Sequence, residues 1–268
     1  MRLTGGNKPL LHVSDADSLG GFITGEGRFA NPDALLPEVT AQSRFAGCTP
    51  EGIPVSVSIG DNQASFLGSA EKPESMVLVN VGTGGQVSAY SAKYVDEPML
   101  DCRPYLNGGF LLTGCPLCGG RAYAILENFL RSCGRLCGAE PEKLYEVMNR
   151  LAEQDLPDAL TVIPTFMGTR TSPDDTGSIS GLTENNFTPA HLICGLVDGM
   201  AEELHGYYRR MRPYLSDERR TLIGSGNGIA RNPALQKRLS ARFGMPLALS
   251  SRKEEAAFGA ARFAMMCK

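Results

Sequence analysis

One stretch, MVLVNVGTGGQVSAY at residues 76–90, constrains the fold of this chain more than any other. A run of apolar, β-branched residues comes first, glycines follow, and a returning apolar run completes the stretch. This pattern predicts an antiparallel β-hairpin with its tip at Gly82, Thr83, Gly84 and Gly85. One interpretation is an ordinary glycine turn. The other is a tip whose unshielded backbone N–H groups and Thr83 hydroxyl cradle nucleotide phosphates.

This stretch matches neither of the two common phosphate-binding turns. A P-loop would continue with Gly-Lys-Ser/Thr, and a Rossmann turn would lead into a helix. Here a second strand is expected directly after the glycines.

The charge and the apolar pattern of the chain narrow the classes of partner. Its 268 residues carry a formal net charge of −3, so nothing electrostatic favours nucleic acid or an anionic membrane. The sequence has no apolar run near the roughly 18 residues of a membrane helix, nor a signal-peptide core at its start. We therefore expect a cytoplasmic protein whose cysteines are mostly thiols.

Asp61 stands where an expected strand at residues 53–59 passes through Gly60 into an expected helix. An aspartate at this place is commonly a helix N-cap. The alternative is a general base, because ligand clefts form at strand ends in α/β folds. A carboxylate there can accept a hydroxyl proton during phosphoryl transfer. The polar run at residues 14–18 is open in the same way, as a solvated turn or as ligand contacts.

A second glycine-rich turn, GSGNG at residues 224–228, follows an expected strand at residues 220–223. Asn232 and Pro233 then open a helix that Gly244 closes. A glycine turn before a helix N-terminus is a common nucleotide contact, through close backbone approach and the helix dipole. It is also an ordinary way to turn a chain.

Four cysteines allow two interpretations. Cys115 with Cys118 and Cys133 with Cys137 have spacings that can bind zinc. Cys133 and Cys137 also fall on the apolar stripe of a helix expected through residues 126–137, where cysteine serves as a small buried hydrophobe. We favour buried thiols and expect no metal-binding residues in this chain.

Five segments together resemble the FGGY family of carbohydrate kinases. They are residues 60–64, 80–85, 164–182, 224–236 and 254–261. The wording VSIGDNQAS at residues 57–65 is most similar to the sedoheptulokinase branch of that family. The resemblance implies an α/β fold, a ribonuclease-H-like domain of the actin/hexokinase/Hsp70 type with a mixed sheet flanked by helices.

The resemblance also implies a reaction and the residues that serve it. The reaction is ATP-dependent transfer of the γ-phosphate to a hydroxyl of a ketose or polyol, including a sedoheptulose-like sugar, with Mg²⁺ as the second cofactor. Asp61 would be the catalytic base, and Asp61 and Asn62 would contact the sugar. The implied nucleotide contacts are Gly82, Thr83, Gly84, Gly85, Gly226, Asn227 and Asn232. The partner is then a small sugar, and a homodimer is compatible with the family.

The resemblance sets in well inside the first of the two family domains. We therefore expect residues 1–70 to be a remnant of the sugar-binding domain with the hinge and Asp61, and residues 71–268 to form the nucleotide-binding domain. The expected enzyme is truncated at its N-terminus. Two alternatives stay open: a non-catalytic nucleotide-binding module of the same fold, and a zinc-stabilised interaction domain.

Overall fold

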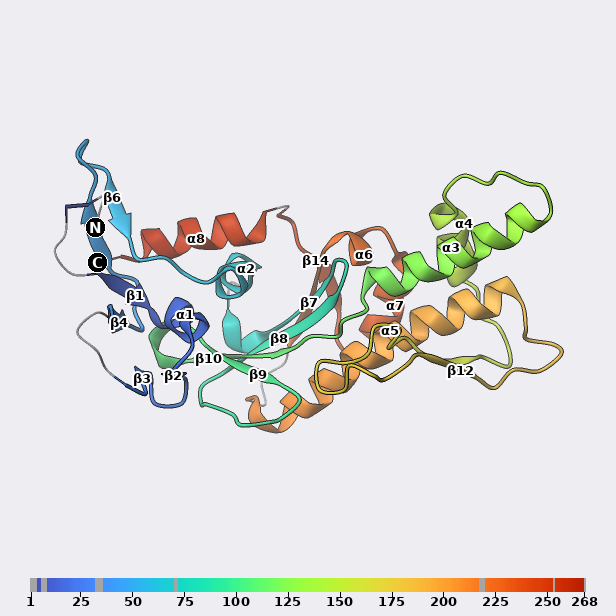
Figure 1. Cartoon of the computed structure of the whole chain (residues 1–268), viewed down its shortest axis with the longest axis horizontal. Coiled ribbons are helices and arrows are strands. Elements are labelled where there is room, and N and C mark those ends of the chain that lie inside the picture. The colour runs from blue at the N-terminus through green and yellow to red at the C-terminus, as the bar shows by residue number, and fades with distance from the viewer. Residues whose placement is uncertain are drawn as a thin grey trace.

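A mixed six-stranded sheet lies at the centre of the computed structural model, which describes residues 4–5, 9–31, 36–69, 72–216, 220–252 and 254–267 (Figure 1). Its strands, in spatial order, are β14 (Leu247–Leu249), β13 (Thr221–Ser225), β7 (Met76–Val81), β8 (Gly85–Ser91), β10 (Phe110–Gly114) and β9 (Asp101–Pro104). The first three are parallel and the last three pairings are antiparallel. The predicted mixed sheet is confirmed.

The hairpin predicted at residues 76–90 forms the centre of this sheet as β7 and β8. Val77, Val79 and Val81 point into the larger apolar core, and Met76 and Leu78 point into a smaller one. Side chains of a strand alternate between the two faces, so a fully apolar strand has to be covered on both.

The larger core is covered by helices on one face of the sheet. These helices are α3 (Gly120–Leu136), α4 (Tyr145–Ala152), α5 (Pro189–Met211), α6 (Asn227–Ala230) and α7 (Pro233–Phe243). Thr188 caps α5 by accepting a hydrogen bond from the His191 amide, and Gly244 ends α7 in the left-handed conformation. Both helix boundaries were predicted from the sequence. A small hairpin, β11 (Thr161–Ile163) with β12 (Ser178–Ser180), lies beside this layer.

Two helices cover the other face, α2 (Asp61–Ser69) and α8 (Glu255–Met265). They approach so closely that a Cβ on Gly259 would lie 1.8 Å from the Ala64 carbonyl oxygen. A Cβ on Gly68 would lie 2.1 Å from the Glu255 carbonyl oxygen. The small residues of α8 therefore serve the close packing expected of them.

The first 60 residues contribute short elements at the end of the molecule where α8 lies, opposite α3 and α4 (Figure 1). They are β1 (Leu10–His12), α1 (Val13–Ala16), β2 (Phe22–Ile23), β3 (Arg28–Phe29), β4 (Glu38–Thr40), β5 (Phe45–Cys48) and β6 (Pro54–Ser56). The strand expected at residues 53–59 is thus confined to its first half. The remaining helical segments are single 3₁₀ turns at Asp17–Leu19, Pro73–Ser75, Leu106–Gly108 and Arg212–Tyr214.

The helix expected through residues 126–137 exists, and Leu126 and Leu130 of its predicted apolar stripe pack against the larger core, but the rest of the stripe does not. Phe129 is 50% exposed and Leu136 is 87% exposed, whereas Ala122, Tyr123 and Glu127 of the same helix are buried. The reason is geometric, because α3 leaves the sheet and its second half extends beyond the central layers (Figure 1).

Within the described parts of the chain, every helix is too short or too polar to cross a bilayer.

Candidate active site

The two glycine turns predicted separately lie side by side. They follow β7 and β13, which are parallel neighbours with Asn80 opposite Ser225. The Asn80 Nδ2 group donates to the Ser225 hydroxyl oxygen over 2.7 Å. Gly226 has φ +81°, and a Cβ on it would lie 2.5 Å from the Val81 carbonyl oxygen. Only glycine fits this conformation and this approach, so the two turns form one surface at the C-terminal edge of the parallel strands, where α/β folds bind ligands.

The start of α3 holds the first turn in place. The Gly119 and Arg121 amides both donate to the Thr83 carbonyl oxygen, over 3.1 and 3.0 Å, and the Gly120 amide donates to the Gly82 oxygen over 2.9 Å. A Cβ on Gly119 would lie 2.2 Å from the Gly84 oxygen. These contacts satisfy free N–H groups of the first helical turn and fix the shape of the tip.

The four residues of the tip differ in what they leave available. Gly82 and Thr83 are exposed, Gly84 is partly buried and Gly85 is buried. The Gly85 amide donates to the Pro116 carbonyl oxygen over 3.0 Å. Gly85 therefore serves packing in this structure, and the exposed amides and hydroxyl of Gly82 and Thr83 are the groups that can meet a phosphate.

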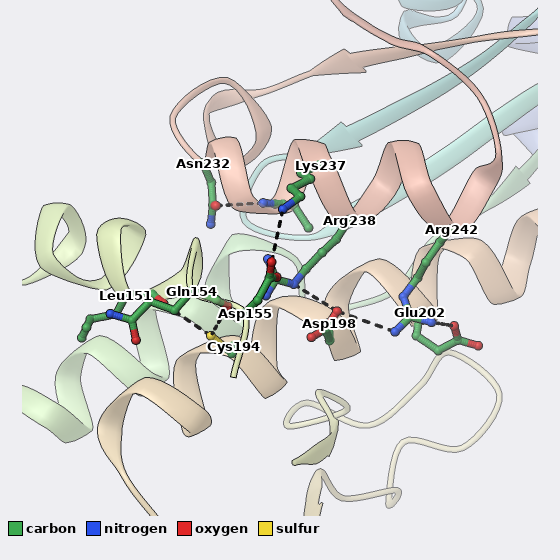
Figure 2. A network of polar contacts seen from close by, with 11 residues as sticks. Leu151, Gln154, Asp155, Cys194, Asp198, Glu202, Asn232, Lys237, Arg238 and Arg242 are labelled. Atoms are coloured by element: carbon green, nitrogen blue, oxygen red, sulfur yellow. Dashed lines mark hydrogen bonds and ion pairs between the residues drawn. The ribbon is translucent and has the colours of Figure 1, made fainter. Parts of the chain in front are cut away.

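The asparagines near the second turn also differ. Asn227 begins α6 and is exposed. Asn232 is buried, and its Oδ1 accepts a hydrogen bond from the Leu235 amide over 3.0 Å as the N-cap of α7 (Figure 2). The helix cap explains an asparagine at position 232, and a direct nucleotide contact of its side chain stays a prediction.

Ion pairs hold α7 against α5 below the second turn. Arg238 Nε donates to Asp198 Oδ1 over 3.0 Å, and Arg242 reaches both Asp198 and Glu202 (Figure 2). Arg238 is largely buried, with 15% of its side chain exposed, so this pair is screened less than a surface pair.

Asp61 is the first residue of α2 and its carboxylate is exposed. Its Oδ1 accepts the hydrogen of the Asn62 amide over 2.7 Å. The N-terminal segment positions the turn before it, because the Ser14 hydroxyl oxygen accepts from the Gly60 amide over 2.9 Å and the Ser58 hydroxyl donates to Asp15. Ser14 and Asp15 thus have a structural role in placing Asp61, and ligand contacts of the run at residues 14–18 stay a prediction.

A polar cavity of about 400 Å³ opens beside Asp61. Its lining brings together Asp17, Ser18 and Thr24 from the N-terminal segment with Asp101 and Arg103 from β9. Arg103 donates to Asp101 over 3.0 Å. A carboxylate, hydroxyl groups and a guanidinium around one cavity suit a ligand rich in hydroxyl groups.

Asn62 turns toward the hairpin. Its Oδ1 accepts a hydrogen bond from Gln86 Nε2, and Gln86 lies directly after the glycine tip on β8. This contact joins the start of α2 to the tip, so the candidate base and the candidate phosphate site belong to one polar edge. The contact of Asn62 with a sugar stays a prediction.

The zinc interpretation is wrong for the four cysteines. Cys115 and Cys118 precede α3, while Cys133 and Cys137 lie at its far end, and a helix of this length separates them by about 20 Å. Among the described residues no group of three or more His, Cys, Asp or Glu side chains could hold a metal. The expectation of buried thiols is also wrong for Cys133 and Cys137, which are exposed, and holds for Cys118.

Two contributors were missed by sequence reasoning. The role of Gly119 and Gly120, which hold the tip in place, could have been inferred from the sequence, because two adjacent glycines stand between a strand and a helix. The role of Gln86 could not have been inferred from the sequence, because it depends on α2 lying across from β8.

The sequence profile of the FGGY family of carbohydrate kinases, C-terminal domain, matches residues 77–267. Sedoheptulokinase from Mus musculus is 27% identical over 97% of this chain and 59% of its own length, and the Homo sapiens protein matches equally well. This chain therefore spans 59% of the length of these curated relatives.

Solved structures of sugar kinases have the same fold. Xylulose kinase from Rhodospirillum rubrum gives a TM-score of 0.84 at 22% identity, over 99% of this chain and 56% of that one. Plasmodium falciparum glycerol kinase with ADP gives 0.81 at 20% identity, over 98% and 55%. These matches confirm the expected actin/hexokinase-type fold, with its mixed sheet flanked by helices.

Proposed function

Because the chain belongs to the FGGY family of carbohydrate kinases, we propose that it supports ATP-dependent transfer of the γ-phosphate to a hydroxyl group of a ketose or polyol. The observation that carries the proposal is the single polar edge on which both glycine turns and Asp61 meet, joined by the contact of Gln86 with Asn62. The matched sedoheptulokinases support a sedoheptulose-like ketose as the acceptor class.

In this proposal Asp61 is the general base. Its exposed carboxylate accepts the proton of the attacking hydroxyl as that oxygen bonds to the γ-phosphorus and the bond to the leaving ADP oxygen breaks. General-base catalysis contributes on the order of 10² to 10⁴ in rate. The transition state of phosphoryl transfer is loose, so positioning and charge stabilisation by the tip matter at least as much.

The nucleotide half of the proposal rests on Gly82 and Thr83 at the phosphates, with Gly84 and Gly85 shaping the tip, and on Gly226, Asn227 and Asn232 beside the adenosine. The exposed amides of the tip and the Thr83 hydroxyl provide donors to phosphate oxygens. Residues at the second turn would then border the remainder of the nucleotide.

Mg²⁺ fits this site as an ion carried by the nucleotide. The described residues offer no cage of three or more ligands. Magnesium commonly binds through substrate phosphates and one or two carboxylates, and Asp61 and Asp17 line the same cavity. When bound, the ion neutralises phosphate charge, while this chain's own residues orient the acceptor and remove its proton.

We also propose the domain division near residue 70. In this division residues 1–70 hold the segment that positions Asp61, and residues 71–268 hold the proposed nucleotide surface at the two glycine turns. The second candidate is a module of the same fold that binds nucleotide at the two glycine turns without turnover.

The test is ATP consumption by the purified chain with glycerol, xylulose and sedoheptulose as acceptors. We expect transfer to at least one of them, and Asp61→Asn to lower its rate by at least about 10²-fold. Asp155→Asn is the matched control, because Asp155 is a 92% exposed carboxylate in a surface ion pair and its loss should leave the rate unchanged. Near-normal turnover in Asp61→Asn would sink the assignment of the base, and ADP binding without any transfer would favour the non-catalytic module.

A further inference from the structure

A second, smaller cavity adjoins the one at Asp61. Its volume is about 110 Å³, and Asp101 lines both cavities. The sheet brings its walls together, since Thr113 on β10 lies opposite Asp101 on β9, and Arg170 reaches in from the loop between β11 and β12. A cavity of this size holds a few water-sized groups.

The Thr113 hydroxyl marks this cavity as a binding site. Thr113 is 1% exposed, and its Oγ1 is buried without a hydrogen-bond partner among the described residues. Buried polar groups are almost always paired, because an unpaired one forfeits its bonds to water. Because Thr113 lines the cavity, a polar ligand group bound there can supply the missing hydrogen bond.

The other polar groups of the cavity suit an uncharged guest. Asp101 accepts through Oδ2 from Arg170 over 3.2 Å and from Arg103 over 3.0 Å, so its charge is compensated and Oδ1 can still accept. Burial raises the pKa of the Cys115 thiol and of the Tyr207 phenol. Both therefore stay protonated donors at neutral pH, and they stand beside the ion pair of Asp101 with Arg170.

A chain of contacts links this cavity to the candidate base. Cys115 Sγ lies 3.9 Å from Gln86 Oε1, and Gln86 Nε2 donates to the side chain of Asn62, the neighbour of Asp61. The small cavity is thus connected to Asp61 by two sets of contacts. One runs through Asp101, which lines both cavities, and the other runs through Cys115, Gln86 and Asn62.

We propose that this cavity is a subsite for the far hydroxyl groups of an acyclic polyol or open-chain ketose whose reacting hydroxyl lies at Asp61. It selects longer carbon chains, because an acceptor has to extend from the cavity at Asp61 into the adjoining cavity at Thr113 to use both. This inference rests on the proposed function and deepens it by naming chain length as the property that is read.

The experiment measures binding without turnover. The purified chain, with no nucleotide present, is titrated with glycerol, xylitol and a seven-carbon alditol and followed by ligand-observed NMR. Three proteins are compared: wild type, Thr113→Val, which keeps the shape and removes the hydroxyl, and Thr113→Ser, which keeps the hydroxyl. Thermal unfolding checks that each variant is folded.

We expect wild type and Thr113→Ser to bind the seven-carbon alditol about tenfold more tightly than glycerol, the equivalent of one good hydrogen bond, and Thr113→Val to lose that preference. An unchanged preference in Thr113→Val would overturn the subsite, as would the absence of alditol binding to wild type.

Transfer from ATP is measured in parallel to separate this inference from the function beneath it. Transfer with the same chain-length preference in wild type and Thr113→Val leaves the kinase proposal standing and removes the subsite. Alditol binding that depends on Thr113 without transfer to any acceptor leaves the subsite standing and removes the kinase proposal.

Discussion

The two sides of the candidate active site differ in the groups that form them, which are backbone on one side and side chains on the other. The nucleotide side is backbone, with Gly82 and Gly226 at the ends of adjacent strands and Gly119 clasping the tip. The acceptor side is made of side chains such as Asp61 and Asp101 that come from segments far apart in the chain. A backbone surface depends on close approach and tolerates no added atoms, whereas a surface of side chains depends on how distant elements are held together.

The nucleotide side should break when a single Cβ is added. Gly226→Ala places a methyl group 2.5 Å from the Val81 oxygen at φ +81°, and we expect it to lower the free energy of unfolding by about 2 to 4 kcal/mol. Gly244→Ala is the matched control, because φ is +63° there and nothing lies within 4 Å. It should cost only the left-handed strain, about 1 to 2 kcal/mol. Urea denaturation of both variants measures the difference, and equal losses would show that close approach at Gly226 is unimportant.

The pH dependence of stability also bears on the two sides, because α5 packs under both the glycine tip and the small cavity. Leu204 of this helix lies under Gly85 of the tip, Tyr207 lines the small cavity, and Glu203 stands beside Leu204 in sequence. Burial raises the pKa of Glu203 from its ordinary 4.5 to about 7. The folded chain thus holds this proton more tightly than the unfolded chain. The contribution of Glu203 to stability should be fully present below pH 4.5 and fall by about 1 to 3 kcal/mol as the pH rises to 7.

Glu203→Gln should remove this loss of stability between pH 4.5 and 7, measured by urea denaturation at several pH values. The neighbouring Glu202 provides the control. Burial raises its pKa, but Arg209 and Arg242 outweigh burial, so the pKa is lowered. Its contribution is present above its ordinary pKa and disappears as the pH falls through the lowered one, so Glu202→Gln should alter only the acid limb. If stability still falls between pH 4.5 and 7 in Glu203→Gln, the loss does not come from Glu203.

The acceptor side should be sensitive to the loss of the hydrogen bonds that position Asp61. Ser14 is 3% exposed, and its hydroxyl oxygen accepts from the Gly60 amide and contacts His12 Nδ1 over 2.8 Å. Ser14→Ala leaves the Gly60 amide unpaired and leaves His12 Nδ1 with the Ser14 backbone N–H alone, and we expect a loss of about 1 to 2 kcal/mol in unfolding free energy. Transfer should slow as well, because the turn carrying Asp61 loses its anchor.

Ser75→Ala is the matched control for that loss, because the Ser75 hydroxyl bonds the Lys72 oxygen at the surface and should cost under about 0.5 kcal/mol. If Ser14→Ala is as mild as Ser75→Ala, the N-terminal segment does not position Asp61.

The contrast between the two sides also explains what the sequence could reveal. The turns at residues 82–85 and 224–228 are local patterns, so their position at strand ends was predictable, as were the caps at Thr188 and Asn232. That the turns pack on each other at Val81 follows from strand order, which local patterns do not show. Asp61 was identified at the start of its helix, but the hydrogen bond from Gly60 to Ser14 joins residues that are far apart in sequence.

The error at the cysteines has a physical reason. The spacing of Cys133, Leu136 and Cys137 predicts an apolar face, and periodicity alone does not tell where a helix leaves the core. Beyond Leu130 the apolar stripe of α3 no longer meets the core, so a correct period gave a wrong burial there.

The smallest expected effect concerns these thiols, which lie outside both sides of the site. A thiol reagent should label Cys133 and Cys137 before Cys118 and Cys194, as followed by peptide mass mapping, because the first two are exposed and the last two buried. Labelling of the exposed pair and treatment with EDTA should leave the melting temperature unchanged. A melting temperature lowered by EDTA would contradict this expectation and indicate a structural metal.

The central claim is that the turns at residues 82–85 and 224–228 bind nucleotide while Asp61 acts on the acceptor. Calorimetric titration with Mg·ADP of wild type and Asp61→Asn tests it most directly. The account predicts saturable binding in the micromolar to low millimolar range, with dissociation constants for the two proteins within about threefold. A wild type that shows no saturable heat up to about 10 mM, or an Asp61→Asn variant that loses ADP binding, would contradict it.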